Sequence, residues 1–310
     1  MDSAVELQKP LQRLMAMDGK KVKRNPLVEE LVRGFLSEDL GYGDITSEAL
    51  IPSDETAKAR LFFKEPGVAA GLEEAAAVFT LLGCEVNQHA PDGARVEARQ
   101  LLLEIEGPAK ALLAGERVAL NIVSHMSGIA TTTAAVVRAA REANPHVRVA
   151  ATRKTLPGLK NLEKKAVELG GGDTHRLRLD DCVLIKDNHL ELLPSITEAV
   201  RLARERVSFT KKIEVEVRDA AQAEEAATAG ADIVMFDNMV PSQIREVLAT
   251  LRPKGLCEGR LFEASGGITP GNAEEYAASG VDVISLGSLT HSAKALDAKL
   301  EIRMIRGMNA

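Results

Sequence analysis

The feature that most constrains the fold is an alternation of short apolar runs and amphipathic helical runs after Asn144-Pro145. The six apolar runs are VRVAATR (147–153), CVLIKDN (182–188), KIEVEV (212–217), DIVMFDN (232–238), LFEASGG (261–267) and DVISLGS (282–288). This pattern is typical of a parallel β-sheet whose strands are joined by crossover helices. Six strands are too few for a complete eight-stranded barrel, so the sequence predicts a truncated or open α/β barrel.

An internal repeat supports this interpretation. Residues 219–238 align with residues 269–288, and each copy is expected to form a capped helix, a glycine stop and an apolar strand. The expected caps are Asp219 and Thr269, and the expected stops are Gly230 and Gly280. The repeat therefore indicates that the second part of the chain is built from similar helix–strand units.

The first part of the chain has a different pattern. Helical spacing predicts a helix over 26–40, begun by an Asn25 cap, and a loop over EDLGYGDIT (38–46). Runs at 56–71, 84–90 and 94–106, with a helix over 72–82, predict a small sheet. From Gly107-Pro108 a long helical stretch runs to about Asn144, with an interruption expected near Gly128. Residues 1–25, with their small basic run, are predicted to be an extension.

Composition restricts the classes of function. The formal net charge is -6 and there are no tryptophans, which argues against binding to a nucleic-acid backbone. The three cysteines are scattered without a CxxC pair, which fits a reducing compartment. The N-terminal segment lacks the apolar core of a signal peptide, so a cytoplasmic location is expected.

Polar or glycine residues end all six predicted strands. Because the carboxyl ends of parallel strands meet at one rim, we expect these residues to form one site. Glu216 and Asp237 end neighbouring strands, and a pair of carboxylates suits Mg²⁺ that bridges a polyphosphate. The alternative, that each acid pairs with a rim cation such as Lys186, remains open at this stage.

Two further groups complete the rim. One is a set of cations suited to a small anion: Arg153, Lys154, His175, Arg176 and Lys186. The other is a set of small residues whose backbone N–H groups can approach a phosphate: Ser265, Gly266, Gly267, Gly287 and Ser288. Lys164 and Lys165 are expected to be solvated on a helix. His189 is expected to be a structural hydrogen-bonding histidine, and Arg117 is ambiguous on its helix.

Several long motifs resemble the quinolinate phosphoribosyltransferase family. They are GERVALNIVSHMSGIAT, ATRKTLPGLKNLEKKAVELGGGDTHRLRLDDCVLIKDNH, IEVEV, GADIVMFDNM, EASGGIT and GVDVISLGSLTHS. The resemblance covers nearly the whole chain, with Leu156 and the KGLCEGRL segment as mild departures. It implies an incomplete, six- to seven-stranded α/β barrel (129–290), with an N-terminal α/β sandwich (26–128) that the C-terminal segment (291–310) joins.

The resemblance also implies a reaction. Quinolinate and phosphoribosyl pyrophosphate (PRPP) would react with Mg²⁺ as cofactor to give nicotinate mononucleotide, pyrophosphate and CO₂, a step of NAD synthesis. By this resemblance Lys154, Lys186, Glu216 and Asp237 are the catalytic residues. The quinolinate pocket is expected to contain Arg153, Lys154, His175, Arg176 and Lys186, and Arg117 from a neighbouring subunit. The PRPP site is expected to contain Glu216, Asp237, Ser265, Gly266, Gly267, Gly287 and Ser288, with Mg²⁺ held mainly through PRPP.

The assembly implied is a homodimer with shared active sites, and a hexamer is a further candidate. Two other functions are open. In an aldolase-like reaction Lys186 would be a Schiff-base nucleophile. In the other, the chain would be a paralogue tied to molybdate transport, or a binding protein that keeps the scaffold without catalysis.

Overall fold

A computed structural model describes residues 20–21 and 25–304 of the chain. Most of the predicted extension, 1–25, therefore lies outside the described residues. The chain divides into two compact units, one made of residues 1–131 and 294–310 and the other of residues 132–293. The boundary falls inside one long helix, α6 (Ala109–Ala143).

The first unit contains a five-stranded antiparallel sheet in the order β1-β4-β6-β2-β13. Its strands are β1 (Lys20–Lys21), β2 (Thr56–Phe63), β4 (Glu85–Gln88), β6 (Leu103–Pro108) and β13 (Ala298–Met304). A two-stranded sheet pairs β3 (Gly67–Val68) with β5 (Arg95–Val96). The C-terminal strand β13 pairs with β2 along its whole length, so the end of the chain returns to this sheet.

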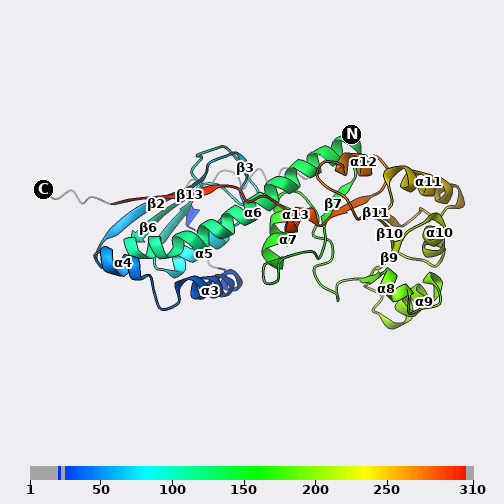
Figure 1. Ribbon diagram of the computed structural model, residues 1–310, viewed down its shortest axis with the longest axis horizontal. Helices are drawn as coiled ribbons and strands as arrows, with labels where there is room; N and C mark the ends of the chain where they lie inside the picture. Colours follow the sequence, from blue (N-terminus) through cyan, green and yellow to red (C-terminus); the bar gives the residue numbers. More distant parts are fainter. Residues whose placement is uncertain (1–19, 22–24, 305–310) are drawn as a thin grey trace. The chain divides into compact units, whose positions relative to one another are not determined.

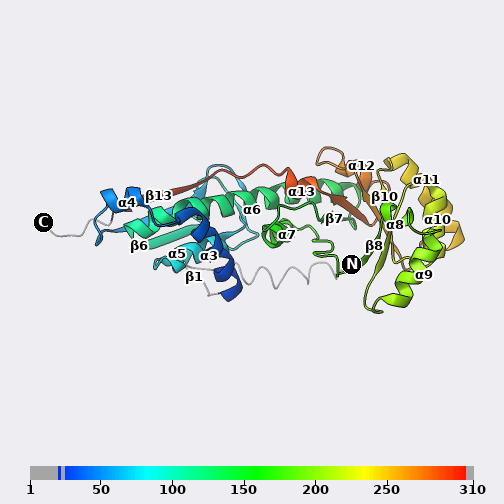
Figure 2. The same cartoon turned by 60° about the horizontal axis from the view of Figure 1, so that its bottom comes forward.

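Two helices pack together beside this sheet, α3 (Pro26–Leu40) and α5 (Leu72–Leu81) (Figures 1 and 2). The helix α3 begins as predicted, because the Asn25 side chain accepts a hydrogen bond from the Leu27 N–H and proline follows at the first position. The loop predicted over 38–46 is wrong at its end. Asp44 caps a short helix, α4 (Ile45–Leu50), by accepting hydrogen bonds from the N–H groups of Thr46 and Ser47.

The helix α6 is continuous, so the interruption predicted near Gly128 is wrong. Gly128 instead allows a close approach, since a Cβ atom there would lie 2.2 Å from the Lys294 carbonyl oxygen. Among the described residues, α6 is the one helix long and apolar enough to cross a membrane. Its most apolar window is 61% buried within the protein, so other elements already cover much of that surface.

The second unit holds a six-stranded parallel sheet in the order β7-β12-β11-β10-β9-β8, which confirms the predicted incomplete α/β barrel. The strands are β7 (Arg148–Ala151), β8 (Val183–Ile185), β9 (Ile213–Val217), β10 (Ile233–Asp237), β11 (Leu261–Ser265) and β12 (Val283–Leu286). The first two strands in the sequence, β7 and β8, form the two edges. The helices α9 (Ile196–Arg206), α10 (Ala220–Thr228) and α11 (Pro241–Leu251) lie outside the sheet (Figure 1).

Four further short helices belong to this unit, three between its strands and the last after β12. They are α7 (Lys160–Leu169), α8 (Asp187–Leu190), α12 (Ala273–Ala277) and α13 (Ser288–His291), and a 3₁₀ turn (Arg252–Lys254) follows α11. The helix α12 is shorter than the repeat predicts, because its cap is Asn272 and not Thr269.

The two copies of the repeat agree in structure at the glycine and at the aspartate that precede each strand. Gly230 and Gly280 have φ angles of 88° and 91°, which glycine adopts without strain. Asp232 then accepts a hydrogen bond from the Ile213 N–H, and Asp282 accepts one from the Phe262 N–H, each at 2.8 Å. Each repeated aspartate thus ties the start of its strand to the start of a neighbouring strand.

Candidate active site

A pocket of about 510 Å³ lies inside the parallel sheet of the second unit. Alternate residues of a strand face the same side, and two such pairs line the pocket, Met235 and Asp237 on β10 and Glu263 and Ser265 on β11, together with Glu216 on β9. The register places Met235 beside both Glu216 and Glu263, and Asp237 beside Ser265. The pocket therefore extends below the strand ends to the inward face of the strands.

The structure brings most of the predicted site residues to this pocket. They are Arg153, Lys154, His175, Arg176, Lys186, Glu216, Asp237, Ser265, Gly266 and Gly267. Gly287 and Ser288 are not among its lining residues. Arg117 is exposed on α6, in the part of that helix that belongs to the first unit.

The cations reach the pocket from three segments. Arg153 and Lys154 follow β7, Arg176 precedes β8, and Lys186 follows β8. The Arg176 guanidinium donates a hydrogen bond of 3.4 Å to the Cys182 carbonyl oxygen. The Lys186 main-chain N–H donates to Nδ1 of His189 at 2.9 Å, so His189 has the structural role predicted for it.

The two predicted acids differ in their partners. Glu216 forms an ion pair with the Lys186 ammonium, the pairing that the sequence left open. Asp237 accepts a hydrogen bond from the Asn238 side chain at 2.9 Å and lies 3.7 Å from Nε of Arg218. Both carboxylates are partly buried and line the same pocket, so they offer hard oxygen ligands to a small cation.

At two glycines of the site, neighbouring atoms leave little room for a side chain. Gly266 has a φ of 91°, and a Cβ atom there would lie 2.4 Å from Oδ1 of Asn238, which itself has a φ of 55°. At Gly287 a Cβ atom would lie 2.8 Å from Cδ of Lys154. Gly287 thus leaves room for the Lys154 side chain, although it does not line the pocket itself.

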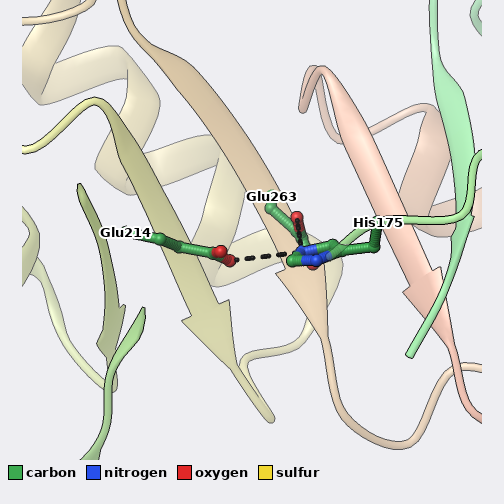
Figure 3. A group of neighbouring side chains, drawn as sticks. All are labelled: His175, Glu214 and Glu263. Atoms are coloured by element: carbon green, nitrogen blue, oxygen red, sulfur yellow. Dashed lines mark hydrogen bonds and ion pairs between the residues drawn. The ribbon is translucent and has the colours of Figure 1, made fainter. Parts of the chain in front are cut away.

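His175 lies against two buried glutamates that the sequence analysis did not select (Figure 3). Its Nε2 atom is 3.2 Å from Oε2 of Glu263 and 3.5 Å from Oε1 of Glu214. The exposed fractions of Glu214 and Glu263 are 0% and 1%. Alternation in IEVEV and LFEAS puts Glu214 beside Glu216 and Glu263 beside Ser265 on the inward face, and this signal would have found them.

The cluster binds a proton more strongly than separate groups would. Burial alone lowers the pKa of His175, but the adjacent carboxylates of Glu214 and Glu263 raise it to about 10 overall. Burial also raises the pKa of the Glu214 carboxyl. In a coupled cluster both shifts describe the uptake of the same proton. Because a proton on Nδ1 would break the 2.7 Å hydrogen bond from the Arg176 N–H, we assign the added proton to the carboxylate side.

Lys164 is not solvated, which corrects the prediction from its helix. Its exposed fraction is 1%, and its ammonium donates a hydrogen bond to the Thr174 carbonyl oxygen, one residue before His175. Burial is the main reason that its pKa falls to about 8. The helical pattern of NLEKKAVELG placed this lysine at the surface because the pattern alone does not show that the 173–176 segment covers it.

Comparisons with known proteins agree with this geometry. Residues 44–127 match the model of the quinolinate phosphoribosyl transferase N-terminal domain, and residues 129–301 match that of the C-terminal domain. The chain belongs to the quinolinate phosphoribosyltransferase family. A probable nicotinate-nucleotide pyrophosphorylase [carboxylating] of Methanothermobacter thermautotrophicus is 47% identical over 277 residues, which cover 89% of this chain and 99% of that protein.

Two further relatives extend this comparison. The human nicotinate-nucleotide pyrophosphorylase [carboxylating] is 41% identical over 272 residues, covering 88% of this chain and 90% of the human protein. The crystal structure of NadC from Streptococcus pyogenes superposes with a TM-score of 0.85 at 38% identity, covering 91% of this chain and 99% of that chain. Membership of the quinolinate phosphoribosyltransferase family disfavours the aldolase-like alternative.

Proposed function

We propose that this member of the family transfers the phosphoribosyl group of PRPP to quinolinate, with decarboxylation, to give nicotinate mononucleotide, pyrophosphate and CO₂. The observation that carries the proposal is one pocket that holds a cluster of cations, two carboxylates and a glycine turn. These match, in order, the dicarboxylate of quinolinate, the ribose of PRPP with its associated cation, and a phosphate.

The cations are proposed to bind and orient quinolinate. Arg153 and Arg176 offer planar forks that suit carboxylates, while Lys154 and Lys186 supply compact positive charges. Together they hold the pyridine nitrogen toward C1 of the ribose, which is a proximity effect. The nitrogen lone pair forms the new bond to C1, and the C1–oxygen bond breaks as pyrophosphate leaves with its electron pair.

The acids are proposed to act on the ribose. As the C1–oxygen bond breaks, positive charge develops on the sugar, and the carboxylates of Glu216 and Asp237 stabilise it or hold the ribose hydroxyls. The ion pair between Lys186 and Glu216 links the two substrate sites, because each residue is proposed to contact a different substrate. Ser265, Gly266, Gly267, Gly287 and Ser288 are proposed to hold the 5′-phosphate of PRPP through backbone N–H groups.

The carboxylates of Glu216 and Asp237 also fit the proposed cofactor, Mg²⁺, which takes one or two carboxylates and completes its shell with phosphate oxygens and water. When bound, it would neutralise charge on the pyrophosphate group. After N-ribosylation the ring carries a pyridinium charge, and this charge stabilises the carbanion left at C2 when CO₂ departs. A proton added to that carbon completes nicotinate mononucleotide.

We further propose that the protein acts in the cytoplasm, supported by three free cysteines, which suit a reducing compartment. The functional proposal is tested by incubating the protein with quinolinate and PRPP, with and without Mg²⁺, and following nicotinate mononucleotide by NMR. Product is expected from quinolinate only when Mg²⁺ is present. Nicotinate replaces quinolinate in the control, and product from nicotinate alone would exclude the decarboxylating reaction.

A further inference from the structure

The carboxylates of Glu214 and Glu263 are buried, but most of their oxygen atoms lack the hydrogen-bond partners that buried carboxylates usually have. Among the residues that the structure describes, neither oxygen of Glu214 has a hydrogen-bond partner, and Oε1 of Glu263 has none. Their shared contact is Nε2 of His175. Burying a carboxylate costs several kcal/mol unless a partner compensates, so two such groups around one imidazole indicate that the position of this ring matters.

Both nitrogens of the His175 ring are engaged by the protein. Nε2 faces the carboxylates, and Nδ1 accepts a hydrogen bond of 2.7 Å from the main-chain N–H of Arg176. A neutral imidazole with its proton on Nε2 satisfies both contacts. In this orientation the ring has no free N–H group for a substrate carboxylate, and it connects the buried glutamates to the backbone that carries Arg176.

The backbone at His175 needs this support. Its φ is 52°, a left-handed conformation that costs a non-glycine residue about 1–3 kcal/mol. Two contacts restrain the same turn, since Asp173 accepts a hydrogen bond of 2.8 Å from the His175 N–H and Lys164 donates to the Thr174 carbonyl oxygen. Thr174 Oγ1 also donates to the His175 carbonyl oxygen at 2.9 Å. The His175 ring is the restraint that bonds to Arg176 directly.

We propose that Glu214 and Glu263 are positioning residues of the quinolinate pocket. They fix the His175 ring, and through it the Arg176 backbone, so that the Arg176 guanidinium faces the substrate dicarboxylate. The inference rests on the proposed function, and it assigns His175 a positioning role in place of the direct contact that the family resemblance implies.

Replacement of Glu263 by two side chains of similar size tests the proposal. Glu263→Gln keeps an oxygen that accepts from Nε2, so its KM for quinolinate is expected to stay within about 3-fold of wild type. Glu263→Met removes the acceptor and should raise this KM about 10-fold or more, while the KM for PRPP changes little. Glu224→Gln, a surface variant whose partner is Lys254, serves as the matched control. A wild-type quinolinate KM in Glu263→Met, or equal rises in both KM values, would overturn the proposal.

A second measurement is made on the wild-type protein, and a variant is used only to assign the signal. In wild-type protein with ¹⁵N-labelled histidine, the His175 ring is expected to carry its proton on Nε2, with Nδ1 as an acceptor; the signal is assigned by its loss in His175→Asn. A proton on Nδ1 would overturn the proposal. This readout needs no substrate, so it separates failure of the inference from failure of the proposed reaction, which would appear as wild-type protein that makes no product.

Discussion

Arg153 and Arg176 reach one pocket from the connection between β7 and β8, and each is expected to form charge-assisted hydrogen bonds with quinolinate. Arg153→Ala and Arg176→Ala should each raise the KM for quinolinate roughly 10- to 100-fold, because such bonds contribute about 1.5–3 kcal/mol. The KM for PRPP should change little. Steady-state kinetics check this, with Arg201→Ala, at an exposed helix pair, as the control. Wild-type quinolinate KM values in both variants would contradict their placement.

The burial of a second residue, Lys164, predicts how the free energy of unfolding depends on pH. Its folded pKa of about 8 lies below the unfolded value of 10.5, so between these values the unfolded chain binds more protons. The free energy of unfolding should therefore rise from pH 8 to pH 10.5, by about 3 kcal/mol at 1.36 kcal/mol per unit. Lys164→Met removes this rise. Urea unfolding of both proteins across this range measures it, and a difference between them that is independent of pH would refute it.

At the scale of helices and strands, Gly128 shows how tertiary contacts override a local pattern. Gly128→Ala adds a methyl group against the Lys294 carbonyl, and should lower the free energy of unfolding by roughly 1–3 kcal/mol despite the better helix propensity of alanine. The matched control is Gly34→Ala, in α3, where no atom lies within 4 Å of the added Cβ. This variant should gain about 0.5–1 kcal/mol. Denaturant unfolding compares them, and equal effects would contradict the argument.

At this scale, the features that the sequence predicted are those set by local patterns, and two of the features that it missed depend on contacts with other segments. The six strands follow from apolar runs and turn signals, which are local, and the strand ends then gave eight of the ten predicted residues that line the pocket. The other two, His175 and Arg176, come from the segment before β8. Glu214 and Glu263 were missed because the search stopped at strand ends, although alternation along β9 and β11 places both inside. Burial of Lys164 and continuity through Gly128 depend on segments distant in sequence, 173–176 and 294–295, which no local pattern reports.

At the scale of the whole molecule, Arg117 bears on assembly. It is exposed on α6, which fits the expectation from the family resemblance that it completes the site of a second subunit in a homodimer. In such a dimer, an Arg117→Ala subunit paired with a Lys186→Ala subunit keeps one complete site, formed by Lys186 of the first and Arg117 of the second.

Mixing the two inactive variants and allowing exchange should therefore restore about a quarter of wild-type activity, because half of the dimers are mixed and each has one intact site of two. Each variant mixed with itself is the control, and light scattering records the assembly. Activity that stays at the level of the separate variants, although exchange is demonstrated with differently tagged subunits, would place Arg117 outside the shared site. The pocket would then have to bind both carboxylates of quinolinate with the cations of one chain.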